Sequence, residues 1–138
     1  MRDLFVRMHK AIRAIEQERG DFEIKCLVSR RADYILWDLV LVASWFEPSE
    51  KDRLRFLYER ILSDLDIDLL IQFSAIITYP SGTENELTKL LSRVQKSVVA
   101  GHYQDPSGDE YSIIEIQSEI ARYVVPLVGS PSRVVNTP

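Results

Sequence analysis

The stretch that decides the fold is residues 34–46, which read YILWDLVLVASWF. Only Asp38 and Ser44 interrupt an apolar run that is rich in β-branched and aromatic side chains. The run is too short to cross a bilayer, which takes about 20 apolar residues. Because it does not alternate between apolar and polar positions, we expect residues 36–44 to form a strand that is covered on both faces.

The residues before this run predict a helix and a first strand. Residues 3–19 place their apolar side chains on one arc of a helix, and Gly20 is a natural stop for it. Residues 22–29 alternate instead, which indicates a half-buried strand near a sheet edge. The short polar link at residues 29–33 favours antiparallel pairing with the run that follows.

The residues after the run predict two strand–helix units. Ser49 is a natural N-cap for a helix that continues to about residue 65, and an apolar strand follows at residues 69–78. Thr83 with Glu86 has the spacing of a capping box for a third helix. Residues 111–116 read as another strand. Residues 118–128 fit either a strand or a short helix, and Pro126 limits the length of both.

The order helix, strand, strand, helix, strand, helix, strand predicts an α/β fold. We expect a mixed, mostly parallel sheet of four to five strands, with an antiparallel N-terminal strand and about three packing helices. A chain of 138 residues is the usual size of one domain. Residues 1–128 are expected to form that domain, followed by a loose tail at residues 129–138.

Composition and charge narrow the class of function. The net charge of −4 argues against a dedicated nucleic-acid binder, but the charge is uneven. Residues 1–31 hold eight Lys and Arg against five Asp and Glu, whereas residues 32–138 hold nine against sixteen. A basic segment beside an acidic body can dock on another copy, on an acidic partner or on phosphates, and a solvated helix face has the same composition. One cysteine and no signal-peptide or membrane pattern favour a cytoplasmic protein.

Three aspartates, Asp64, Asp66 and Asp68, alternate with apolar residues before the third strand. A calcium loop starting at Asp64 would need Gly at its sixth position and Glu at its twelfth, and the chain has neither. Residues 66–69 resemble the Asp-apolar-Asp-apolar element of minimal nucleotidyltransferases, with Glu115 as a third carboxylate. The Gly-Ser pair that those proteins carry upstream is missing. We therefore expect no metal and no cofactor.

The best position for a small anionic ligand is the rim formed by the carboxyl ends of the two central strands. Both strands lead there into helix N-termini, whose free N–H groups favour anions. Hydroxyl and aromatic side chains gather at this rim. They are Ser44, Trp45, Ser49, Thr78, Tyr79, Ser81 and Thr83. Helix capping alone also places Ser and Thr at such positions.

No set of catalytic residues can be assembled from the spacing. Cys26 falls on the apolar face of its strand, His9 lies on the first helix, and His102 lies in a polar loop. The pattern for nucleophilic catalysis is thus incomplete, and we expect no catalytic residue.

Aromatic and basic residues give two candidate interaction surfaces. Phe56 lies opposite the apolar stripe of its helix among arginines, which is the composition of a contact hot spot. Trp45 and Phe46 form a second patch, and the first helix carries Arg7 and Arg13.

The sequence favours a non-enzymatic interaction or accessory subunit that forms a homodimer or docks on a larger protein, and does not associate with a membrane. One alternative is a small enzyme or sensor that binds phosphate or a nucleotide at the rim. Another is an accessory factor in nucleic-acid processing that uses the basic first helix.

Overall fold

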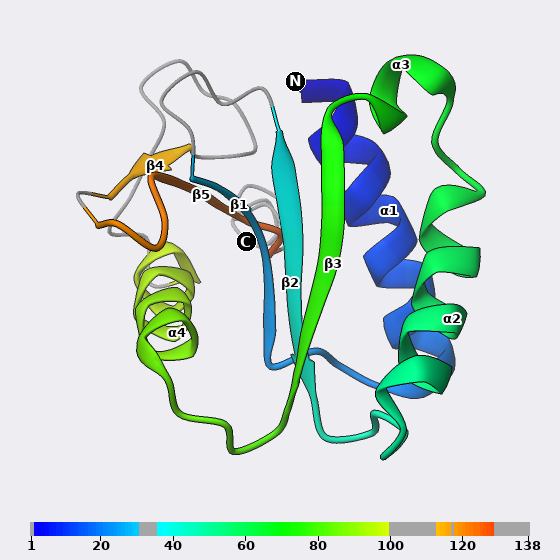
Figure 1. Ribbon diagram of the computed structural model, residues 1–138, viewed down its shortest axis with the longest axis horizontal. Coiled ribbons are helices and arrows are strands. Elements are labelled where there is room, and N and C mark those ends of the chain that lie inside the picture. The colour runs from blue at the N-terminus through cyan, green and yellow to red at the C-terminus, as the bar shows by residue number, and fades with distance from the viewer. Residues whose placement is uncertain (1, 31–35, 100–112, 117, 129–138) are drawn as a thin grey trace, which may run out of the picture.

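The computed structural model describes residues 2–30, 36–99, 113–116 and 118–128 (Figure 1). Within these ranges, five strands and four helices follow one another. They are α1 (Arg2–Arg19), β1 (Ile24–Ser29), β2 (Trp37–Ala43), α2 (Glu50–Leu62), α3 (Ile67–Leu70), β3 (Phe73–Pro80), α4 (Glu86–Val99), β4 (Ile114–Glu115) and β5 (Tyr123–Pro126).

The strands form one mixed sheet in the order β3-β2-β1-β5-β4, which confirms the α/β class. Only β2 and β3 are parallel, and the other three pairings are antiparallel. The expected mixed sheet is therefore present, but the prediction that most of its pairings are parallel was wrong. The reason is that a single strand–helix–strand crossover, β2-α2-β3, places two strands side by side, whereas after α4 the chain returns in β4 and β5 to the other side of β1.

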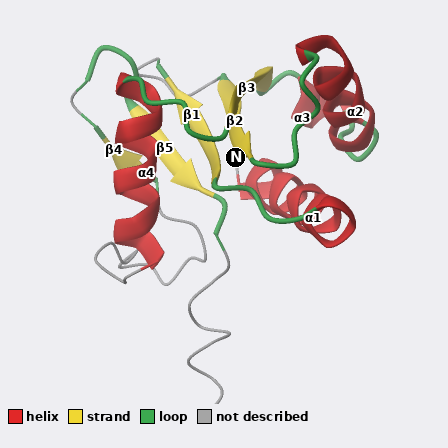
Figure 2. Cartoon of the chain, turned by 90° about the horizontal axis from the view of Figure 1, so that it is seen from below, coloured by secondary structure: helices red, strands yellow, loops and turns green. Residues whose placement is uncertain are grey.

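Helices cover both faces of the sheet. α1, α2 and α3 lie on one side, and α4 lies on the other (Figure 2). The side chains of β2 alternate between the two layers: Leu39 and Leu41 pack toward α1 and α2, whereas Val40 and Val42 pack toward α4. The prediction that residues 36–44 form a doubly covered strand is confirmed for β2.

β1 is a central strand rather than the near-edge strand that its alternating pattern predicted, because β2 and β5 flank it. The charge that misled the prediction is Lys25. Its ammonium lies 2.8 Å from a carboxylate oxygen of Glu16 on α1, and both side chains are largely buried. Glu16 also accepts the backbone N–H of Phe22, so the pair ties α1 to the entrance of β1.

The predicted helix caps had different outcomes. The Ser49 side chain accepts the N–H of Asp52 at the start of α2, as expected. At α4 the cap is two residues later than the predicted Thr83. The Asn85 side chain accepts the N–H of Thr88, and the Thr88 hydroxyl accepts the N–H of Asn85. This reciprocal pair replaces the expected box with Glu86.

The segment that was ambiguous in the sequence, residues 118–128, contains the strand β5. The predicted polar loop at residues 101–110 and the tail at residues 129–138 lie outside the described residues. None of the described helices is both long enough and apolar enough to traverse a membrane.

Trp37 is the largest fully buried side chain of the described core. Its ring packs edge-on against Phe5 of α1, with the ring centroids 5.4 Å apart. The indole N–H has no hydrogen-bond partner among the described residues. Trp37 therefore contributes packing while it leaves one buried donor unsatisfied, which is unfavourable by about 1–3 kcal/mol.

We expect Trp37→Ala to lower the free energy of unfolding by about 3–5 kcal/mol, because the substitution leaves a large cavity. Trp37→Phe keeps an aromatic ring and removes the unpaired donor, so its loss should stay below about 1.5 kcal/mol. Urea denaturation followed by circular dichroism measures both values. Both substitutions remove the indole N–H, so equal losses for the two variants would contradict a packing role for the aromatic ring.

Candidate functional site

The parallel pairing of β2 with β3 brings the predicted rim together at one end of the sheet. Ala43 at the end of β2 lies opposite Pro80 at the end of β3. The segments that follow these strands leave the rim on opposite sides, since β2 leads to α2 and β3 leads to α4 (Figure 2). The seven rim residues are therefore divided between the two faces of the sheet.

Three of them serve the packing of α1 and α2. The Trp45 indole donates to the backbone carbonyls of Gly20 and Asp21, at 3.0 and 3.2 Å. Ser49 caps α2. Thr78 is buried, and its hydroxyl accepts a hydrogen bond from the guanidinium of Arg53 at 2.8 Å. Ser44 is exposed at the end of β2.

Arg53 was grouped in the sequence with the exposed arginines around Phe56, but it is only 6% exposed. Besides Thr78, it donates to the carbonyl oxygen of Glu47 at 3.0 Å and approaches the ring of Phe46. A charged group in this position binds α2 to β3 and to the segment between β2 and α2. Its role in the described contacts is structural.

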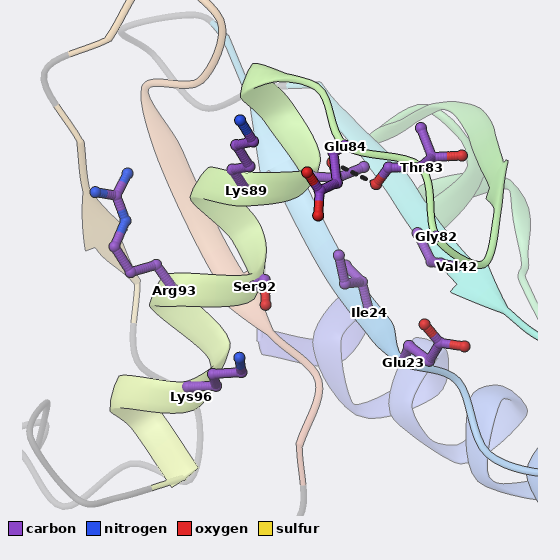
Figure 3. Close-up of a pocket in the computed structure, with 11 residues that line it drawn as sticks. Glu23, Ile24, Val42, Gly82, Thr83, Glu84, Lys89, Ser92, Arg93 and Lys96 are labelled. Atoms are coloured by element: carbon purple, nitrogen blue, oxygen red, sulfur yellow. Dashed lines mark hydrogen bonds between the residues drawn. The ribbon is translucent and has the colours of Figure 1, made fainter.

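The other rim residues face α4, where a groove of about 540 Å³ opens (Figure 3). Thr83 lines this groove together with Gly82 and Glu84 from the segment between β3 and α4. Tyr79 packs nearby, half-buried against the core on the α4 side. The Ser81 hydroxyl donates to the carboxylate of Glu23 at 2.6 Å and fixes one border of the groove.

The groove contains three basic residues that sequence reasoning missed, Lys89, Arg93 and Lys96. All three are exposed on α4, and none is paired with a carboxylate of the described residues. Their spacing of i, i+4 and i+7 puts them on one side of the helix. That spacing was the available signal, but polar helix faces commonly look the same.

The structure separates Glu115 from the segment that carries the three aspartates. The side chain of Asp66 caps α3 by accepting the N–H of Leu69 at 3.1 Å, so these residues start a helical turn and not a strand. Asp66 and Asp68 line a small hollow with Asp3 and Arg7 of α1. Glu115 lies on β4, at the opposite edge of the sheet. Among the described residues there is no group of three potential metal ligands.

Cys26 lies in the core between β1 and α4 and is fully buried. Burial raises the pKa of its thiol to about 12. Its sulfur lies 3.6 Å from the side-chain oxygen of Gln95. Such a thiol is protonated at neutral pH and is a poor nucleophile. His9 is buried on α1, and His102 lies outside the described residues.

Phe56 is part of an aromatic and arginine cluster between α1 and α2. The guanidinium carbons of Arg19 and Arg60 lie 4.2 and 4.9 Å from its ring centroid. Trp45 lies edge-on to it, and Phe46 packs on Trp45. A hydrogen bond from Arg60 to Glu18 lowers the pKa of Glu18 and holds the cluster to α1. Contacts within the chain thus occupy much of the surface predicted for a partner.

Two arginines of α1 make polar contacts within the chain. Arg7 donates to the backbone carbonyl of Asp64 at 3.0 Å, and Arg19 pairs with Glu47 at 3.1 Å. Lys10 and Arg13 are exposed.

Comparison with known proteins gave no match. No protein-family model fits the chain, and no curated protein and no solved structure matches it.

We expect Arg53→Met to lower the free energy of unfolding by about 2–4 kcal/mol, since it leaves Thr78 and the Glu47 carbonyl without their charged donor. Arg55→Met is the matched control, because Arg55 is exposed on the same helix and should change stability by less than about 0.5 kcal/mol. Urea denaturation measures both variants. Equal effects would contradict a structural role for the Arg53 guanidinium.

Burial of Cys26 predicts a dependence of stability on pH. The unfolded thiol loses its proton near its ordinary pKa of 9.0, whereas the folded thiol keeps it up to about pH 12. The unfolded state therefore binds fewer protons between these values, and the free energy of unfolding falls as the pH rises from about 9. Urea titrations from pH 8 to 10.5 should show this fall. Cys26→Ala should remove the part of the fall that the thiol causes.

Proposed function

We propose that this protein is a non-enzymatic interaction subunit that associates with a second copy through the outer edge of β3. The observation that carries the proposal is an eight-residue edge strand whose outer edge pairs with no other described strand (Figure 1). An open strand edge offers a row of backbone hydrogen-bonding groups to another chain. Its single reduced cysteine is compatible with the cytoplasm as the place of action.

The hydrogen bonds of β3 indicate which backbone groups are available. The N–H of Ile76 donates to the Tyr58 hydroxyl at 3.0 Å, so it points away from β2. Because backbone groups alternate along a strand, the N–H of Thr78 points the same way. Pro80 is in the same phase and has no N–H, as suits the end of an edge strand. A docking strand would meet the edge at Ile76 and Thr78, and at Ile76 it would take the place of the Tyr58 hydroxyl.

The side chains of β3 lack the usual protection against pairing. Residues 73–79 read FSAIITY and contain no charge, whereas natural edge strands commonly carry charged side chains that prevent association. The opposite edge, β4, is only two residues long. Identical uncharged strands also pair without like-charge repulsion. These features favour β3 as the edge that pairs with another copy.

Exposed apolar side chains continue the surface beyond the strand. Ile67 and Ile71, at the α3 end of β3, are 71% and 65% exposed. Ala75, Ile77 and Tyr79 are half-exposed on the α4 side of the strand. Apolar groups beside an open edge add contact area to strand pairing.

A second candidate function is binding of a phosphate-bearing ligand, and the basic groove beside α4 is the observation that favours it. A role in nucleic-acid processing has less support from the geometry, since Arg7 and Arg19 are engaged within the chain.

Ser74→Lys tests the proposed function. Ser74 is exposed on β3, so the substitution should leave the fold intact and place two like charges in the paired edge. We expect the wild-type chain to sediment as a dimer and Ser74→Lys to weaken the dimer by about tenfold or more. Analytical ultracentrifugation over a concentration series measures this, and circular dichroism checks the fold.

Ser63→Lys is the matched control, because Ser63 is exposed at the end of α2, away from the edge. Tyr58→Phe frees the N–H of Ile76 and should strengthen association. A wild-type chain that stays monomeric at high concentration would refute the proposal. A dimer that Ser74→Lys and Ser63→Lys leave equally unchanged would place the contact elsewhere and refute it too.

A further inference from the structure

We propose that the groove between α4 and the sheet binds a small organic anion that has one negatively charged group and an apolar body. The volume of about 540 Å³ is in the range of sites for small molecules. This inference concerns the opposite face of the molecule from α1 and α2, and it does not depend on association through β3.

The charged group is recognised by the α4 side of the groove. Lys89, Arg93 and Lys96 all come from this helix, and Ser92 lies between them and adds a hydroxyl donor (Figure 3). Because none of the three cations forms an ion pair with a described carboxylate, they can pair with an anionic ligand. Cations that line one wall of a concave surface favour an anion.

The apolar body is accommodated by the sheet. Ile24 at the start of β1 and Val42 at the end of β2 line the groove next to α4. They belong to the core on the α4 side, so their positions are set by packing. An apolar floor beside a charged wall selects an amphipathic ligand over a fully hydrated ion such as inorganic phosphate.

The acidic border limits the ligand to one negative group. Glu23 and Glu84 lie across the groove from the lysines of α4 (Figure 3). A second anionic group at this border would be repelled, whereas a hydroxyl or amine donor would be accepted. The distribution of charge therefore gives the ligand a direction in the groove.

Hydrogen bonds hold the borders of the groove in place without a ligand. Gln95 of α4 accepts the N–H of Lys25 at 3.0 Å and donates to the carbonyl of Glu23 at 2.8 Å. The bond from Ser81 to Glu23 and the reciprocal pair of Asn85 and Thr88 fix the opposite segment. A groove that is organised in this way loses little entropy on binding.

The test uses nuclear magnetic resonance titration of the full chain with four probes: 2-naphthoate, 2-naphthyl phosphate, 2-naphthalenemethanol and 2,6-naphthalenedicarboxylate. We expect the two probes with a single acidic group to shift the amide signals of Gly82, Thr83 and Ser92. The neutral probe should bind about tenfold more weakly or worse, and the dicarboxylate should bind more weakly than naphthoate. The tighter of the two acidic probes identifies a carboxylate or a phosphate head group.

Lys89→Glu with Lys96→Glu should weaken 2-naphthoate binding by about tenfold or more. Lys10→Glu with Arg13→Glu is the control of equal charge, since both residues are exposed on α1 on the other side of the sheet. It should change the affinity by less than about threefold. Absence of shifts at the groove with millimolar probe, equal effects of the two double variants, or equal binding of the neutral probe would each overturn the proposal.

Discussion

β2 carries large apolar side chains on both of its faces, and the layers on either side of the sheet are arranged to cover them. Leu39 and Leu41 are covered by α1 and α2, while Val40 and Val42 are covered on the side of α4. A strand of this kind is stable only between two layers. The chain must therefore pass from one face to the other after β3. The segment that makes this passage also forms one border of the groove.

Local patterns predicted the elements better than their arrangement. The helices α1, α2 and α4 follow from apolar stripes of helical period, and β2 follows from its uninterrupted apolar run. The number of parallel strands did not follow, because the place of β5 beside β1 depends on contacts between distant residues. Lys25 made β1 look half-exposed, since its partner Glu16 belongs to another element and no local pattern shows that ion pair.

The sequence predicted at which end of the sheet the candidate site lies, but it did not predict which side chains form the surface of that site. Parallel pairing brings the ends of β2 and β3 together, and Thr83 does line a groove there. Neighbouring residues of a strand point to opposite faces, however, so Thr78 joins Arg53 in the core while Tyr79 packs toward α4. The cations of α4 were missed because a solvated helix face has the same composition. Which face of the sheet forms a ligand site depends on how the helices pack on it.

The position of β5 also has a consequence for how the chain folds. β5 fills the place beside β1, and Cys26 lies opposite Pro126, about 100 residues later. Until the last strand is available, β1 is an open edge with an apolar surface on both sides. Pairings between such distant segments slow folding and prolong the exposure of surfaces prone to aggregation. During synthesis β1 emerges long before β5, and until β5 pairs with it β1 is open to contact with other chains.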